Sequence, residues 1–199
     1  MNETWILASG SPRRRELLAI LGVPFLVKVT DSEEKITSED PQMVTEELSE
    51  QKALAVAQMC REQMVQGDRV IVLGFDTVVS ARGRILGKPK DRKEAGQMIG
   101  LLQGDSHMVY TGVTILVLES NQPIKKTFSV GTRVMVAPMT KEEIEAYLDT
   151  DEPYDKAGAY GIQGGFARYI EGIEGDYFNV VGLPVHKVYE ELKELSSVL

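Results

Sequence analysis

Three consecutive arginines stand where a helix is predicted to begin, in the stretch "LASGSPRRRELL" near the start of the chain. Ser11 suits the N-cap position of that helix, and Pro12 suits its first residue, where a missing N–H costs nothing. Arg13, Arg14 and Arg15 then crowd a first turn that is already electropositive, which is unfavourable unless an anion binds there. A phosphate group would supply that anion. By helical spacing, Arg15 faces away from its neighbours as a surface residue.

A carboxylate follows the most strongly apolar run of the chain, "RVIVLG" at residues 69–74. That β-branched run predicts a strand covered on both faces, so Asp76 stands at its carboxyl end, where sites in α/β proteins are commonly built. Asp76 could hold a divalent cation there or accept a proton from water. Position alone supports equally a plain turn formed by Asp76 and Thr77.

Two lysines and a second carboxylate extend this candidate site. Lys88 lies between a glycine and a proline, from which an ammonium group can reach a phosphate, although a lysine in a tight turn is more often solvated. Lys52 falls on a predicted long helix, where most lysines lie on the surface. Glu34, in "DSEEK", is a candidate second metal ligand, although the residues alone favour a charged loop.

The stretch "DKAGAYGIQGG" is rich in glycine and alanine, a composition that lets the backbone approach a ligand closely. Gln163 lies among these glycines, and its amide can donate and accept hydrogen bonds at the edge of a nucleobase. An ordinary loop amide is the more frequent explanation of such a glutamine. The sequence contains neither the P-loop pattern nor a G-x-G-x-x-G between a strand and a helix, which disfavours P-loop ATPases and Rossmann dehydrogenases.

The elements that must position these residues alternate irregularly between strands and helices. This order predicts an α/β fold with a mixed central β-sheet flanked by helices, in a single domain over residues 1–199. The long helix after Asp40 is expected to bury Val44, Leu48, Ala55, Val56 and Met59. Strands are predicted at 4–8, 25–29, 69–74, 107–118 and 125–137, helices at 12–21, 91–104 and 140–149 and after Asp40 and Pro184, and hairpins at 77–86 and 166–181.

Composition narrows the classes of function. The formal net charge is −8, which disfavours a general nucleic-acid binder. With Cys60 as the only cysteine and two histidines, the 199-residue chain offers no internal disulfide and no Cys/His zinc site, and a Ser-His-Asp triad is improbable. We expect a cytoplasmic protein that does not interact with membranes, because the sequence has no secretion signal and no apolar run long enough to cross a bilayer.

Taken together, the motifs resemble the Maf family of nucleoside triphosphate pyrophosphatases. "SGSPRR" is similar to the family's N-terminal signature, S-x-S-P-R-R. The likeness continues in order through "EEK", "KALAVA", "GFDT", "LGKP", "YTGV", "EEIEAYL", "DKAGAYGIQG" and "VVGLPV", from about residue 5 to residue 193. Phe75 is a departure, since a small residue is more usual at that position.

The resemblance implies a fold of two lobes around a nucleotide-binding cleft, in a family that is often dimeric, so a homodimer is an expectation. It also implies hydrolysis of nucleoside triphosphates between the α and β phosphates, with Mg²⁺ or Mn²⁺ as the divalent cation. The catalytic residues that it implies are Asp76 as proton acceptor with Lys52, Lys88 and Glu34, and the metal ligands are Asp76 and Glu34. The substrate-binding residues that it implies are Ser9, Arg13, Arg14, Thr77 and Gln163, of which Arg13, Thr77 and Gln163 are typical of the branch acting on dTTP and UTP.

Two other functions remain open on the sequence. One is a non-catalytic nucleotide-binding regulator of cell division, which would bind nucleotide and release no pyrophosphate. The other is a house-cleaning pyrophosphatase for inosine or xanthosine triphosphate, which would prefer purines. A structural scaffold is disfavoured, because it gives no reason for arginines at a helix start to occur with an aspartate after a buried strand.

Overall fold

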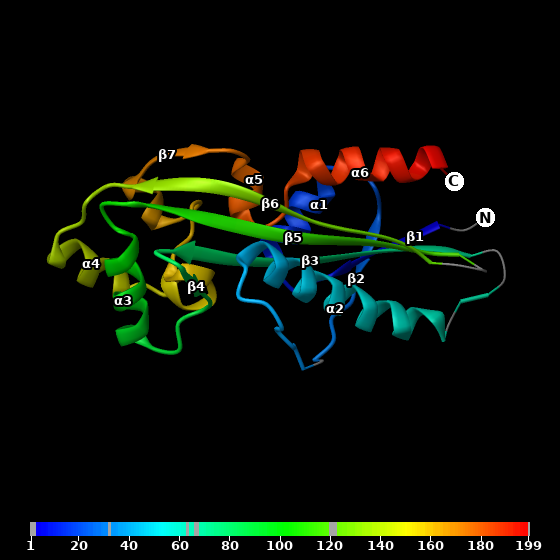
Figure 1. The fold of residues 1–199 in the computed structure, drawn as a ribbon, viewed down its shortest axis with the longest axis horizontal. Helices are drawn as coiled ribbons and strands as arrows, with labels where there is room; N and C mark the ends of the chain where they lie inside the picture. Colours follow the sequence, from blue (N-terminus) through cyan, green and yellow to red (C-terminus); the bar gives the residue numbers. More distant parts are fainter. Residues whose placement is uncertain (1–2, 32, 63, 66–67, 120–122, 199) are drawn as a thin grey trace. The chain divides into compact units, whose positions relative to one another are not determined.

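A computed structural model of the protein describes residues 3–31, 33–62, 64–65, 68–119 and 123–198 (Figure 1). Its strands are β1 (Glu3–Ala8), β2 (Phe25–Val27), β3 (Arg69–Ala81), β4 (Arg84–Leu86), β5 (Ser106–Leu118), β6 (Ile124–Val136) and β7 (Ile170–Glu174). Its α-helices are α1 (Pro12–Ala19), α2 (Pro41–Arg61), α3 (Arg92–Leu102), α4 (Lys141–Leu148), α5 (Tyr177–Val181) and α6 (Val185–Val198). Short 3₁₀ helices at Glu152–Asp155, Ala157–Ala159 and Gly165–Tyr169 follow α4.

The strands form one mixed sheet, as predicted. Its order is β2-β1-β3-β5-β6-β7, and β4 pairs with β3 outside that path. Strand β1 runs parallel to both β2 and β3, whereas β4 pairs antiparallel with β3 and β7 pairs antiparallel with β6. Among the described residues, no helix is long and apolar enough to cross a membrane.

The chain divides into two compact units. Unit 1 comprises residues 1–76, 111–130 and 182–199, and unit 2 comprises residues 77–110 and 131–181. Strands β3, β5 and β6 each contribute residues to both units. The boundary in β3 falls directly after Asp76, so the predicted site residues are divided between the units. The prediction that a strand over 69–74 ends before Asp76 was wrong, because the strand continues to Ala81 and its last residues pair with β4, so Asp76 lies within β3.

In unit 1, α2 packs unusually closely against the sheet. Gly74 in β3 and Gly112 in β5 face this helix, and a Cβ atom added at either glycine would overlap the α2 backbone. Two polar side chains of α2 are fully buried at this contact, where Thr45 meets Ser129 at 3.1 Å and Ser49 meets Thr114 at 2.9 Å between hydroxyl oxygens.

The buried face of α2 differs from the predicted one. Val44, Leu48 and Val56 are buried as expected, but Met59 is 44% exposed and Ala55 is only partly buried. The prediction for these two residues was wrong because it left Thr45 and Ser49 out of the buried face. Their hydroxyl hydrogen bonds bury them, so the buried face of α2 is rotated by about one residue from the predicted one. The other buried residues of this face are Ala53, Ala57 and Cys60.

The predicted hairpin over residues 166–181 was also wrong. Only one strand, β7, forms there, and it pairs with β6 rather than with a following strand. Gly175 has a φ of +126°, and the chain then enters the short helix α5. Strand β7 therefore obtains its hydrogen-bond partners from a distant part of the chain.

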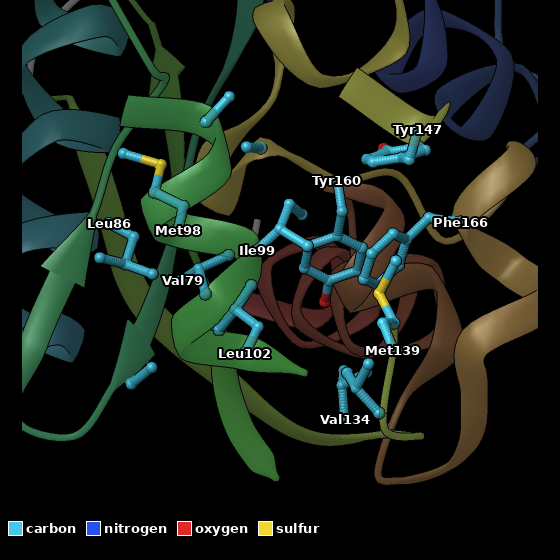
Figure 2. Close-up of a cluster of buried hydrophobic side chains, with 14 of the residues drawn as sticks. Val79, Leu86, Met98, Ile99, Leu102, Val134, Met139, Tyr147, Tyr160 and Phe166 are labelled. Carbon is cyan, nitrogen blue, oxygen red and sulfur yellow. The ribbon is translucent and has the colours of Figure 1, made fainter. Parts of the chain in front are cut away.

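The core of unit 2 is built around aromatic rings (Figure 2). The ring of Phe166 lies 4.8 Å from that of Tyr160 and 5.1 Å from that of Tyr147, measured between centroids. Aliphatic side chains from α3 and from strands β3, β4 and β6 complete the cluster, including Val79, Leu86, Ile99, Leu102 and Val134. This core holds the segment that carries Gln163, because Tyr160 and Phe166 flank it in sequence.

A histidine buried in the same unit gives a prediction for stability. His107 in β5 is 3% exposed, and its Nε2 lies 2.7 Å from the Tyr160 hydroxyl oxygen. Burial lowers the pKa of His107 from 6.5 to about 4. The unfolded chain therefore binds a proton more readily than the folded one between these values, and stability falls as the pH is lowered through this window. The full loss attributable to this group is about 3 kcal/mol.

The measurement is denaturant unfolding of wild type and His107→Gln at pH 7 and at pH 5. The variant is expected to be less stable at pH 7 but to lose less free energy of unfolding on acidification than the wild type. Effects of carboxylates that do not interact with His107 are common to both proteins and cancel in this comparison, whereas Asp105, whose charge opposes the lowering of the His107 pKa, contributes to the difference. An equal loss in the two proteins would contradict the assignment to His107.

Candidate active site

The first helix begins as its sequence predicts. Ser11 is the N-cap of α1, its hydroxyl accepts a hydrogen bond from the Arg14 backbone N–H at 3.5 Å, and Pro12 is the first helical residue. Strand β1 ends at Ala8, which places Ser9 between the strand and the helix. The Ser9 hydroxyl accepts hydrogen bonds from the Ser11 N–H at 3.3 Å and from Arg14 Nη1 at 3.2 Å.

Arg14 is a fixed, partly buried cation. Its Nε donates to the Gly182 carbonyl at 3.0 Å, and its guanidinium carbon lies 6.0 Å from the centroid of the Phe75 ring. Burial lowers the pKa of Arg14, while the negative charge of Asp76 opposes that shift and the charge of Arg13 adds to it. A guanidinium group stays protonated over the physiological range despite such a shift. The fully buried ring of Phe75 therefore helps to hold the Arg14 guanidinium in place through a cation–π interaction.

Lys52 joins the two predicted carboxylates. Its ammonium nitrogen lies 3.1 Å from Glu34 Oε1 and forms a hydrogen-bonded ion pair with Asp76 Oδ1. The Asp76 side chain is 13% exposed, and that of Glu34 is 46% exposed. The ammonium group comes from α2, the Asp76 carboxylate from β3 and the Glu34 carboxylate from the segment between β2 and α2. Unit 1 thus brings together three residues that lie far apart in sequence.

These carboxylates fit the donor set of a hard divalent cation. Mg²⁺ is commonly held by one or two protein carboxylates, with water and substrate phosphates as its other ligands. Both carboxylates reach one Lys52 ammonium group, so they converge on a common positive charge. In the described part of the chain, no group of three or more His, Cys, Asp or Glu side chains is arranged to hold a metal ion. Glu34 and Asp76 as metal ligands therefore stay a prediction that the donor chemistry supports.

Arg13 lies in α1 of unit 1 and is partly buried, and the other three predicted residues belong to unit 2. Thr77 follows Asp76 in β3, and Lys88 is exposed in the segment between β4 and α3. The Gly158 N–H donates to the Gly87 carbonyl at 3.0 Å, which ties the glycine-rich segment to the residue before Lys88. Gln163 is exposed on that segment. Unit 2 thus joins the segments that carry Lys88 and Gln163.

Sequence reasoning missed Glu152, which shapes this same segment. Its carboxylate accepts hydrogen bonds from the Gly165 N–H at 2.6 Å, the Tyr147 hydroxyl at 3.1 Å and the Phe166 N–H at 3.4 Å. A Cβ atom at Gly164 would overlap that carboxylate. The position of the Glu152 carboxylate thus requires glycine at position 164 and is fixed by the Gly165 N–H. The only sequence signal was an acidic residue followed by "GG" twelve positions later, which no general pattern distinguishes.

A comparison with known families decides the classification. The family model of Maf-like proteins matches residues 4–195, nearly the whole chain. The chain belongs to the Maf family. The resemblance of the motifs from "SGSPRR" to "VVGLPV" is confirmed by this match, and several Maf motif residues (Ser9, Arg14, Glu34, Lys52 and Asp76) lie together in unit 1.

Curated Maf relatives are similar over almost their whole length. A protein of Agathobacter rectalis named dTTP/UTP pyrophosphatase is 46% identical over 197 residues, covering 96% of each chain. Relatives with the same name from Bacillus cytotoxicus and Lachnoclostridium phytofermentans are 47% and 44% identical, covering 97% and 95% of this chain and 96% and 93% of theirs. Among solved structures, the Ham1 protein of Staphylococcus aureus aligns with a TM-score of 0.41 and 16% identity over 68% of this chain and 72% of that one.

Proposed function

We propose that this Maf protein hydrolyses nucleoside triphosphates between the α and β phosphates, releasing a nucleoside monophosphate and pyrophosphate, with dTTP and UTP as preferred substrates. Relatives at 44% to 47% identity carry the name dTTP/UTP pyrophosphatase. The observation that carries the proposal is the ion-paired group of Asp76, Lys52 and Glu34 in the same unit as the partly buried Arg14 cation. We further propose that it acts in the cytoplasm and clears unwanted nucleotides from the triphosphate pool.

In this proposal Asp76 accepts the proton of the attacking water. The water oxygen forms a bond to the α-phosphorus, the bond from the α-phosphorus to the bridging oxygen breaks, and pyrophosphate leaves with the electron pair of that bond. Lys52 orients the Asp76 carboxylate through their hydrogen bond. The positive charge of Lys52 also offsets the repulsion between the Asp76 carboxylate and the negatively charged substrate. Arg14, fixed by Ser9 and Gly182, offsets charge on the phosphates without having to reorganise.

The family also implies a divalent cation, Mg²⁺ or Mn²⁺. Asp76 and Glu34 would hold it, and it would polarise phosphate oxygens and offset their charge. We assign Arg13 and Lys88 to the phosphates, and Thr77 and Gln163 to the choice of base. A homodimer also stays a prediction.

The decisive experiment is a panel of canonical and modified triphosphates incubated with Mg²⁺, in which pyrophosphate and orthophosphate are measured separately. Release of pyrophosphate with faster turnover of dTTP and UTP is the expected result. Binding without turnover would instead indicate a nucleotide-responsive regulator. Preference for inosine or xanthosine triphosphate would indicate the purine house-cleaning activity.

Gln163→Ala is expected to change substrate choice more than turnover. If the Gln163 amide pairs with the pyrimidine edge, its removal lowers kcat/KM for dTTP and UTP by about 10-fold and leaves the rate on poor substrates nearly unchanged. The measurement is kcat/KM for dTTP, UTP and inosine triphosphate. Gln97→Ala, at an exposed glutamine of α3, is the matched control and is expected to match the wild type. An equal loss on every substrate would refute the role in base choice.

A further inference from the structure

Glu34 lies in a stretch that regular secondary structure does not hold in place. Between β2, which ends at Val27, and α2, which begins at Pro41, the described residues form neither helix nor strand. A carboxylate on such a stretch is fixed in space only if other contacts restrain the backbone around it. Its precise position matters because Glu34 is one of the two carboxylates paired with Lys52.

The side-chain amide of Gln51 supplies such a restraint. The Lys35 N–H donates to Gln51 Oε1 at 2.9 Å, and Gln51 Nε2 donates to the Lys35 carbonyl at 2.7 Å. One glutamine therefore satisfies both backbone groups of the residue next to Glu34, as a neighbouring strand would. Two simultaneous hydrogen bonds, one to the peptide group on each side of the Lys35 Cα, fix the orientation of the Lys35 backbone as well as its distance from α2.

A second anchor lies one helical turn earlier in α2. The Glu47 carboxylate accepts hydrogen bonds from the Thr37 N–H at 2.9 Å and from the Thr37 hydroxyl at 2.5 Å. Glu47 and Gln51 are four residues apart and so lie on the same side of the helix. These two anchors hold the backbone of the segment against α2 on either side of Ile36.

The contacts of Lys35 and Glu34 with α2 involve neighbouring residues both in the segment and in the helix. Gln51 binds Lys35, while the next helical residue, Lys52, pairs with the preceding segment residue, Glu34. Loosening the contact of Gln51 with Lys35 should therefore release the Glu34 carboxylate from Lys52. Gln51 itself has no contact with Asp76 among the hydrogen bonds and ion pairs of the described residues.

We infer that Gln51 is a positioning residue for the reaction, which holds the Glu34 carboxylate beside the Lys52–Asp76 pair through the Lys35 backbone. This inference rests on the proposed function, because it assigns Gln51 to the same site. It separates Gln51 from ordinary polar residues of an exposed helix face, whose replacement by alanine is nearly neutral.

The test is a double-mutant cycle with Gln51→Ala, Glu34→Gln and the two combined. Gln51→Ala alone is expected to lower kcat/KM for pyrophosphate release by about 5- to 50-fold, the range for two lost hydrogen bonds, and to raise the Mg²⁺ concentration for half-maximal activity. In the Glu34→Gln background the same substitution is expected to change kcat/KM by less than about 2-fold. Faster amide hydrogen exchange at residues 33–38 in Gln51→Ala is the expected structural readout.

The matched control is Gln58→Ala, at an exposed glutamine of the same helix, which is expected to match the wild type in kcat/KM and Mg²⁺ dependence. Wild-type kcat/KM in Gln51→Ala, or equal effects of that substitution with and without Glu34, would overturn the inference while leaving the proposed function intact. Absence of pyrophosphate release from the wild type would instead overturn the proposed function, and the inference with it.

Discussion

Asp76→Asn is expected to lower the rate of pyrophosphate release by about 10³-fold, within the range that a positioned general base contributes. Asparagine has nearly the same shape as aspartate, but its amide cannot accept the proton of the attacking water at neutral pH. The substitution also leaves the Lys52 ammonium paired with Glu34 alone, because the ion pair with Asp76 is lost. Binding of a triphosphate should remain measurable, since a negative charge is removed near an anionic ligand.

The measurement combines single-turnover kinetics for pyrophosphate release with calorimetric titration of UTP. Asp151→Asn is the matched control, because Asp151 is exposed and makes no capping hydrogen bond to the 3₁₀ helix that follows it. We expect this control to match the wild type in both measurements. Turnover near the wild-type rate in Asp76→Asn would exclude Asp76 as the proton acceptor.

The elements that the sequence predicted best are those defined by local chemistry. The N-cap of α1 by Ser11 follows from side chains within four residues of the helix start. At α4, the Thr140 hydroxyl accepts a hydrogen bond from the Glu143 N–H and the Glu143 carboxylate accepts one from the Thr140 N–H, a capping box that a threonine followed three residues later by a glutamate typically forms. The turn between β3 and β4 places Arg82 at φ 48° and Gly83 at φ 73°, as a tight hairpin requires.

Interactions between distant residues explain what the sequence did not show. Thr45 and Ser49 can be buried because their hydroxyl groups form hydrogen bonds with Ser129 and Thr114. These partners lie 84 and 65 residues away in the chain, so no local pattern contains them. Strand β7 likewise depends on β6 rather than on its own neighbours in sequence. Periodicity assigns polar residues to the exposed face of a helix, so it fails where polar pairs are buried.

The site residues show the same division. Asp76 was recognisable because it follows the apolar run at residues 69–74, although it lies within β3 and not after it. Lys52 and Glu34 were recognised through the family motifs. Gln51 and Glu47 could not be found in this way, because a glutamine and a glutamate on a helix are ordinary surface residues until their partners are known. Only the structure shows that Gln51 bonds to the Lys35 backbone and that Glu47 bonds to Thr37.

A second large effect is expected from adding one methyl group at Gly74. The new Cβ atom would lie 2.9 Å from the Cβ of Ala53 and closer still to the Ser49 carbonyl oxygen, so helix α2 must shift away from β3. Forcing atoms into such a packed contact costs about 2 to 3 kcal/mol of unfolding free energy. Gly112→Ala is expected to cause a similar loss, because its Cβ would lie 2.7 Å from the Glu46 nitrogen and overlap the Thr45 carbonyl.

The measurement is denaturant unfolding, with Gly100→Ala as the control. Gly100 lies in α3, and an added Cβ atom meets nothing within 4 Å outside its own helix, so this substitution is expected to raise stability by about 0.5 to 1 kcal/mol. A helix shift at Gly74 also has a consequence for activity, since the same helix carries Lys52 and Asp76 lies two residues after Gly74. Gly74→Ala should therefore lose pyrophosphate release even at temperatures where it remains folded. Unchanged stability and activity in this variant would show that the close packing of α2 on β3 does not set the position of Lys52 beside Asp76.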